Sequence, residues 1–172
     1  MTFDITEKMT LDQKEIYSKL RDSFPFPLVE FANELGVEVY AVDLPSHISG
    51  KIENKNGKYI IQLNQNNSPK RLRFTLAHEL GHFFNDKDYL DSGHEITDQS
   101  KQLYLAQGIA LDPDIQKRDV IANQFAAEIL MPEAAFIKTW KESKTPEEVA
   151  SFFNVSLDAV KYRSANLLGE IY

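Results

Sequence analysis

Two histidines four residues apart lie within a dense apolar segment of this chain, and the rest of the chain has to fold around that segment. It starts at Ser68-Pro69, a pair typical of a helix start, and continues through Leu, Phe and Ala residues to Phe84. The segment therefore predicts a buried central helix. Residues four apart on a helix differ by about 40° in azimuth and 6 Å in rise, so His78-Glu79-Leu80-Gly81-His82 places both imidazoles on one face.

Two imidazoles on one helix face can bind a single metal ion. Glu79 is rotated away from a ligand position, but it can reach a water molecule beside the ion as a general base. Left unpaired on a buried helix, these polar groups would be costly to desolvate, and a cation offsets that cost. Gly81 is unfavourable in a helix interior by about 1 kcal/mol, which a close approach of another backbone would explain. We expect a metal at His78 and His82.

A catalytic zinc usually has three protein ligands and one open position, so a third ligand must come from elsewhere in the chain. Asp119 is the strongest candidate, because Asp119, Ala122, Asn123 and Ala126 share one face of a predicted helix. The two alanines let that helix approach the histidines, and Asn123 can support a ligand from behind. By spacing alone, it is equally compatible that Asp119 is an ordinary acidic residue that stabilises the N-terminal end of its helix.

Other residues remain open for the same roles. Asp88 lies six residues after His82, where metzincin-like sites place their third ligand, and Asn85 stands where those sites have a turn glycine. His47 and His94, the other two histidines, are more typical of solvated loops. A donor that stabilises the oxyanion is also needed, and the sequence leaves four candidates: Tyr89, Tyr104, Tyr162 and Arg163.

Composition limits the class of protein further. The chain has 172 residues and a net charge of -7, which disfavours direct binding of nucleic acid. It has no cysteine, which excludes disulfides and thiolate metal sites. No window approaches 18 consecutive apolar residues, and the start has no signal-peptide pattern. We expect one cytoplasmic domain over residues 1–172 with no membrane contact; the oligomeric state is not indicated.

We expect an α+β fold that is mainly helical, with a small three-stranded antiparallel sheet. Asn56-Gly57 between two alternating segments predicts a hairpin. The acidic stretch 86–100 is expected to be a loop. An N-terminal helical extension covers 1–24, and a C-terminal helical pair packed on the core covers 145–172. Strands are expected at 37–42, 48–53 and 58–64, and helices at about 11–22, 28–35, 69–84, 114–130, 146–153 and 156–168.

Two blocks of the sequence resemble the ImmA/IrrE family of metallo-endopeptidases. They are RLRFTLAHELGH at 71–82 and IANQFAAEILMP at 121–132. The segment from Phe153 to Arg163 is also similar to the family's C-terminal helical pair, so the resemblance covers roughly residues 28–168. It implies a zincin-like metallopeptidase fold with one Zn²⁺ per chain, although another divalent metal is compatible.

The resemblance also implies which residues carry the activity. In the family, the two motif histidines and a downstream acid bind zinc, and the acid is commonly Glu. The matching position here is Asp119, one methylene shorter, so the ligand must come closer or the metal must sit differently. Glu79 takes the place of the catalytic base.

Family members typically cleave a helix-turn-helix transcriptional repressor and so relieve repression of mobile-element or stress-response genes. A basic repressor would suit the acidic stretch of this chain. The alternative is a non-enzymatic, metal-containing regulator that acts by binding a repressor or another protein; the intact Glu79 argues against it, because a structural metal site needs no base. A third reading takes 146–168 as a DNA-binding helix-turn-helix. Its three acidic and two basic residues give a net charge of -1, which disfavours that reading.

Overall fold

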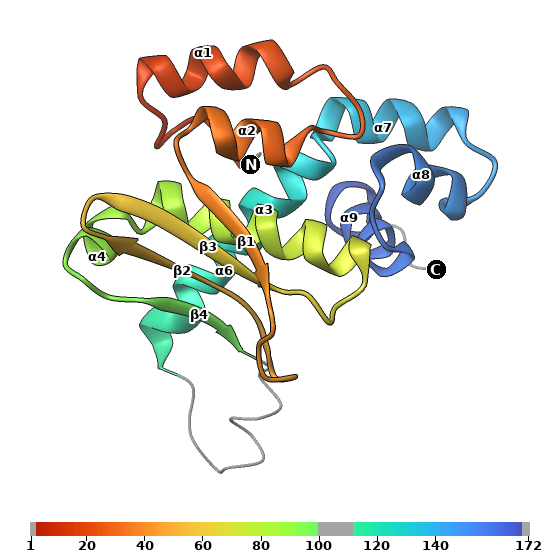
Figure 1. Cartoon of the computed structure of the whole chain (residues 1–172). Helices are drawn as coiled ribbons and strands as arrows, with labels where there is room; N and C mark the ends of the chain where they lie inside the picture. The colour runs from red at the N-terminus through yellow and green to blue at the C-terminus, as the bar shows by residue number, and fades with distance from the viewer. Residues whose placement is uncertain (1–2, 100–111, 170–172) are drawn as a thin grey trace.

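The computed structural model describes residues 3–99 and 112–169, which form an α+β fold (Figure 1). Its strands are β1 (Glu38–Val42), β2 (Ile48–Lys55), β3 (Lys58–Asn64) and β4 (Ile96–Gln99). Its helices are α1 (Leu11–Leu20), α2 (Leu28–Glu34), α3 (Pro69–Asn85), α4 (Lys87–Asp91), α6 (Pro113–Leu130), α7 (Glu133–Glu142), α8 (Pro146–Phe153) and α9 (Leu157–Leu168).

Local sequence signals set several of these boundaries. The Ser68 side chain accepts a hydrogen bond from the Arg71 amide at the start of α3, and Ser156 caps α9 in the same way. Asn56 and Gly57 both have positive φ, 55° and 86°, as a two-residue hairpin turn requires. The turn joins β2 to β3 and confirms the predicted hairpin.

The sheet differs from the predicted three antiparallel strands. It has four strands in the order β1-β3-β2-β4, and β1 runs parallel to β3. The hairpin makes β2 antiparallel to β3, and the chain also reverses between β1 and β2. Two reversals restore the original direction, so β1 must be parallel to β3 once it pairs with it. The buried Asn64 amide holds the reversing segment through the carbonyls of Leu44 and Ile48.

The loop that acidic composition predicts for 86–100 is wrong for the described part of the stretch, residues 86–99. Residues 87–91 form the short helix α4, and residues 96–99 form β4, which pairs antiparallel with β2. Ile96 lies opposite Ile52 in this pairing. Four residues are too few to show a reliable strand pattern, so the pairing depends on contacts with a segment more than 40 residues earlier in the chain.

A further helix, α7, occupies residues for which the sequence predicted no element. Pro132, read as the end of the preceding helix, also stands at the N-cap of α7. Proline lacks an amide hydrogen, and the first amides of a helix have no intrahelical partner, so proline is well tolerated at a helix start. The same residue therefore ends α6 and begins α7.

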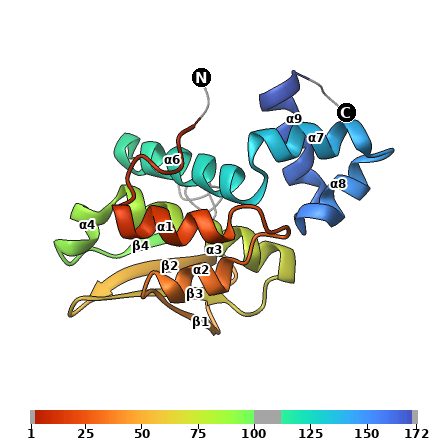
Figure 2. The same cartoon turned by 90° about the horizontal axis from the view of Figure 1, so that it is seen from above.

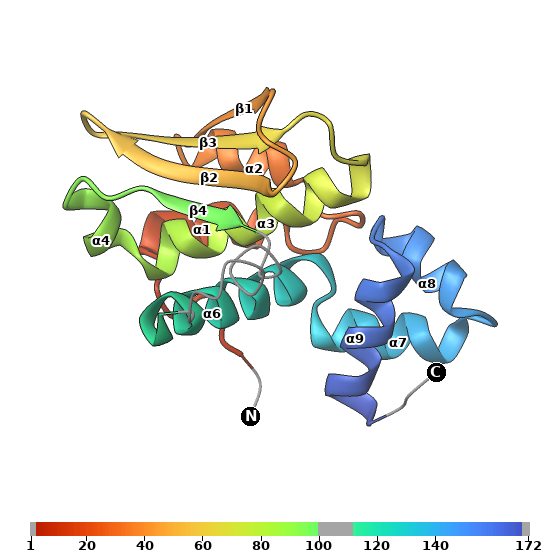
Figure 3. The ribbon, with the colours of Figure 1, turned by 90° about the horizontal axis from the view of Figure 1, so that it is seen from below.

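The central helix α3 lies between the sheet and α6 (Figures 2 and 3). Every residue from Thr75 to Phe84 in α3 is buried. Helix α2 packs against β1 and α3, and α1 packs against α2. Helices α7, α8 and α9 form a group at the end of α6 (Figure 1). His78, Glu79 and His82 of α3 are thereby buried under other elements.

The C-terminal pair α8–α9 is tied to the rest of the fold by polar contacts and aromatic packing. Arg163 of α9 donates hydrogen bonds to the Glu128 carboxylate and the Met131 carbonyl. Phe24 packs edge-on against Phe153 of α8, with ring centroids 5.5 Å apart. Among the described residues, no single helix meets the length and apolarity needed to cross a membrane, although α6 and α7 meet it as a pair bent by 54°.

Candidate metal centre

Helices α3 and α6 touch backbone to backbone beside the histidine motif. A Cβ atom placed on Gly81 would lie 2.9 Å from the Cα of Ala122 and 3.1 Å from its carbonyl oxygen. Any larger residue at position 81 would push the helices apart. This close approach is the one that the sequence suggested for Gly81, and it brings the N-terminal half of α6 within reach of the histidines.

His78, His82 and Asp119 come together at this contact. Their side chains are 3%, 0% and 24% exposed. The Nε2 atoms of the two histidines are 3.1 Å apart, and Asp119 Oδ1 lies 3.6 Å from each. Ligand atoms about 2.1 Å from a tetrahedral zinc lie roughly 3.3–3.4 Å from one another. The three atoms therefore fit around one ion of that size, with little adjustment.

The other nitrogen of each imidazole is already engaged. His78 Nδ1 lies 2.8 Å from Asn123 Oδ1, the contact expected for Asn123, and His82 Nδ1 lies 2.7 Å from Asp86 Oδ2. Both oxygens accept hydrogen bonds from Nδ1, so each imidazole turns its Nε2 toward Asp119, where that atom can bind a metal or a proton. The tautomers required for metal binding are thus set by α6 on one side and by the end of α3 on the other.

Glu79 is fully buried, and neither of its carboxyl oxygens has a hydrogen-bond partner among the described residues. Burial raises the pKa of Glu79 to about 8, against the opposing effect of the His78 charge. Such a buried carboxyl is costly unless a cation lies close to it. This orphaned group supports a metal at the adjacent histidines, since the ion would favour the ionised form that a general base needs.

Asp98 on β4 forms a second group with His78 and Glu79. One ligand atom from each of the three residues lies within 4.8 Å of the others. Asp98 stands opposite Gly50 on β2, and a Cβ on Gly50 would come 3.4 Å from Glu79 Oε1. Strand β2 therefore also approaches the motif, and the edge strand β4 adds a carboxylate.

The three candidate ligands shift one another's pKa values. Against the effect of burial, contact with Asp119 raises the pKa of both His78 and His82. The two imidazoles in turn hold the pKa of Asp119 well below its usual range. The carboxylate is thus ionised and faces two nitrogen atoms that bind either protons or a cation.

The alternative ligands lie elsewhere. Asp88 is exposed on α4, and Asn85 continues α3 rather than forming the turn that a metzincin-like site needs. His94 is exposed and stacks on Tyr89, with ring centroids 4.3 Å apart. His47 stands between β1 and β2 and belongs to neither group of potential ligands in the described residues. Of the candidates, Asp119 alone joins both histidines.

The described candidates for an oxyanion donor have different surroundings. Tyr162 is 63% exposed on α9, and Arg163 is held by Glu128 and the Met131 carbonyl. Tyr89 lies on α4 under the Arg118 guanidinium. Tyr104 lies outside the described residues.

Two carboxylates near the histidines were missed by sequence reasoning. Asp86 is four residues after His82, so helical spacing alone could have placed it on the same face. Asp98 offered no such signal, because it reaches the motif only through the pairing of β4 with β2.

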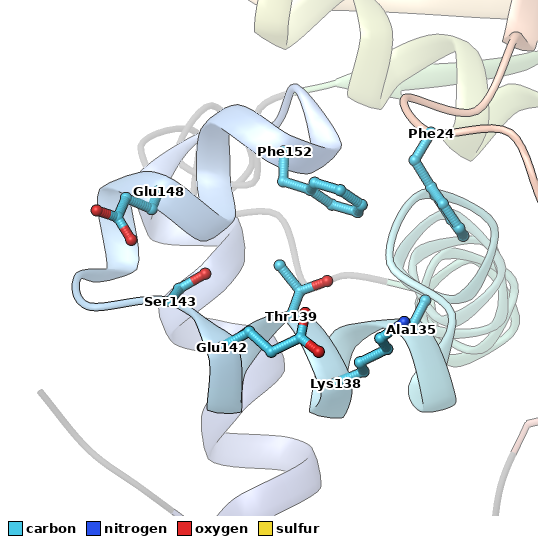
Figure 4. A pocket seen from close by; sticks show the side chains of 8 residues that line it. All are labelled: Phe24, Ala135, Lys138, Thr139, Glu142, Ser143, Glu148 and Phe152. Carbon is cyan, nitrogen blue, oxygen red and sulfur yellow. The ribbon is translucent and has the colours of Figure 1, made fainter.

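A separate pocket of about 350 Å³ lies among α7, α8 and Phe24 (Figure 4). Phe24 and Phe152 are its aromatic lining residues, and Lys138 and Glu142 of α7 also line it. None of the candidate ligands lines it, so it is distinct from the candidate metal centre.

Comparison with known proteins identifies the family. The family described as the IrrE N-terminal-like domain, Peptidase_M78, matches residues 32–165. The chain belongs to this family. The match covers both blocks that carry the sequence resemblance. Family membership relates the chain to metallopeptidases.

The fold is also similar to that of a solved structure, a Mycobacterium tuberculosis transcriptional regulator. The TM-score is 0.59 at 16% sequence identity, and the similarity covers 89% of this chain and 45% of the other. The chain thus spans less than half the length of that protein, and at this identity the likeness concerns the fold alone. The search of curated proteins found no match.

Proposed function

We propose that this protein is a zinc-dependent endopeptidase that cleaves a helix-turn-helix transcriptional repressor and thereby relieves repression of mobile-element or stress-response genes. The observation that carries the proposal is the meeting of His78, His82 and Asp119 beside a fully buried, unpartnered Glu79. A purely structural metal site needs no such carboxyl.

His78, His82 and Asp119 are the residues that would hold the metal. When bound, a divalent metal supplies Lewis-acid chemistry, polarising a substrate carbonyl and lowering the pKa of water. Glu79 takes a proton from the attacking water and delivers it to the leaving amide nitrogen. Asn123 and Asp86 keep both imidazoles turned toward the centre.

The proposed substrate is supported by family membership and by charge. The chain carries 26 acidic and 19 basic residues, whereas a DNA-binding repressor needs a basic surface to contact phosphates. Direct DNA binding by α8–α9 is disfavoured, since Arg163, one of its two basic residues, is paired with Glu128.

Cleavage of the helix-turn-helix repressor encoded beside this gene tests the proposal. Zinc content is measured first, and the repressor is then incubated with wild type, Glu79→Gln and the exposed control Glu15→Gln. We expect one zinc per chain in all three, cleavage by wild type and the control, and at least about 100-fold slower cleavage by Glu79→Gln.

Two outcomes would contradict the proposal. Equal cleavage by wild type and Glu79→Gln would remove Glu79 from the chemistry. One zinc per chain with repressor binding but no cleavage by any form would instead establish the non-enzymatic regulator.

A further inference from the structure

Arg118 joins the two helices of the candidate metal centre at a point behind His82. It directly precedes Asp119 on α6, and its Nε lies 3.5 Å from Oδ1 of Asp86 at the end of α3. The other oxygen of Asp86 accepts the hydrogen bond from His82 Nδ1 at 2.7 Å. Asp86 therefore uses one oxygen for each partner, and Arg118 reaches His82 through it.

A third element holds the guanidinium of Arg118. Its central carbon lies 3.9 Å from the centroid of the Tyr89 ring on α4, within range of a cation–π contact. Tyr89 is in turn stacked on His94, with ring planes 17° apart. The planar group is thus fixed between a carboxylate and an aromatic face, an arrangement that suits arginine better than lysine.

Asp86 needs this support because it borders open space. A surface pocket of about 590 Å³ is lined by residues that include Asp86, Tyr89 and Arg118. The Asp86 side chain is only 11% exposed, against 29% for Arg118, so the arginine lies on the outer side of the pair. Without the guanidinium, the carboxylate is free to turn toward the pocket and to exchange its bond with His82 for water.

We propose that Arg118 is a positioning residue for the metal centre: it holds Asp86 so that Asp86 keeps the His82 imidazole oriented toward the metal. Adjacent residues of α6 would then act on the same ion, Asp119 directly and Arg118 through two side chains. The inference rests on the metal site of the proposed function and extends it to a residue outside the group of candidate ligands.

When Arg118 loses its charge, the proposal and simple electrostatics predict opposite changes in metal affinity. Removing a positive charge near a bound cation reduces repulsion and should strengthen binding. Removing a group that orients a ligand should weaken it, since partners behind metal ligands typically contribute 10–100-fold to affinity. The sign of the change therefore separates the two roles. Lys117, exposed on the same helix, provides a matched loss of charge.

The experiment measures zinc affinity by chelator competition and thermal unfolding of the metal-free forms. We expect Arg118→Gln to bind zinc roughly 10-fold more weakly and Lys117→Gln to bind it unchanged or slightly more tightly. We expect Arg118→Lys to fall between wild type and Arg118→Gln, because it keeps the charge and loses the planar contact. In an Asp86→Ala background, Arg118→Gln should change the affinity less than about 2-fold, since the route through Asp86 to His82 is gone.

The outcomes are distinguishable. A wild type that binds no zinc contradicts the proposed function itself. If wild type binds zinc, an affinity of Arg118→Gln equal to or above that of Lys117→Gln overturns this inference alone. An unchanged effect of Arg118→Gln in the Asp86→Ala background also overturns it, because the arginine would then act by another route.

Discussion

Gly81 of α3 and Ala122 of α6 bring the backbones of the two helices into contact. A Cβ atom added to Gly81 would lie 2.9 Å from the Cα of Ala122. Gly81 is next to His82, and Ala122 is one helical turn after Asp119. The contact therefore sets the separation between the histidines and the third candidate ligand. The backbone of Ala122, together with the Cβ of Phe125 at 3.1 Å, limits what position 81 can hold.

Gly81→Ala is expected to destabilise the protein and weaken zinc binding. Alanine gains about 1 kcal/mol in helix propensity over glycine, but overpacking typically costs about 1–3 kcal/mol and would displace Asp119. Chemical denaturation and zinc competition measure both effects. Adding Ala122→Gly should give no rescue, because the clash is with the Ala122 backbone and the Phe125 Cβ, which that change leaves in place. Full stability of Gly81→Ala would show that the helices can separate freely.

Asp119→Ala is expected to lose stoichiometric zinc, whereas Asp88→Ala is expected to keep it. Asp119 Oδ1 lies 3.6 Å from both Nε2 atoms, whereas Asp88 is exposed on α4. Zinc content per chain after dialysis checks the prediction. Loss of zinc from the Asp88 variant, with retention in the Asp119 variant, would reverse the assignment.

Asn123→Ala should weaken zinc binding by about 10–100-fold while changing the fold little. The substitution removes the acceptor 2.8 Å from His78 Nδ1, which fixes the tautomer and orientation of that imidazole. The neighbouring exposed Gln124→Ala serves as the control. An Asn123→Ala affinity equal to that of the control would mean that His78 needs no support from α6.

Arg163→Met tests whether Arg163 is structural or catalytic. The side chains of Arg163 and Glu128 are 10% and 12% exposed, so losing one partner of the pair should cost about 3 kcal/mol. Zinc content should not change. Glu128→Gln in the same chain should recover part of the loss, because no buried charge is then left alone. Near-wild-type stability with lost cleavage would instead favour Arg163 as an oxyanion donor.

The same variant has a predicted pH dependence. Burial raises the pKa of Glu128 above its usual 4.5, although Arg163 opposes the shift. A carboxyl with a raised folded pKa stabilises the fold below its unfolded pKa and loses that contribution as the pH rises through the folded value. Removing Arg163 raises the folded pKa further. The stability difference between Arg163→Met and wild type should therefore be smaller near pH 4 than at pH 7, and denaturation at the two pH values measures it.

Short-range patterns in the sequence were sufficient for the motif and for many element boundaries. The Asn56-Gly57 turn, the Ser68 and Ser156 caps and the helix that carries His78 and His82 each depend on residues within a few positions of one another. Such interactions are local, so one stretch of sequence contains both partners. The alanine-lined face of α6 similarly predicted a close approach to the histidines.

Tertiary structure decided which distant segments meet at that motif. The parallel pairing of β1, the strand β4 with Asp98, and the link from Arg118 through Asp86 to His82 all join segments separated along the chain. Spacing left Asp119 equally compatible with a helix-end acid, and the packing of α6 on α3 brought it to both imidazoles. Contacts of this kind depend on the summed packing of many elements, which no local pattern contains.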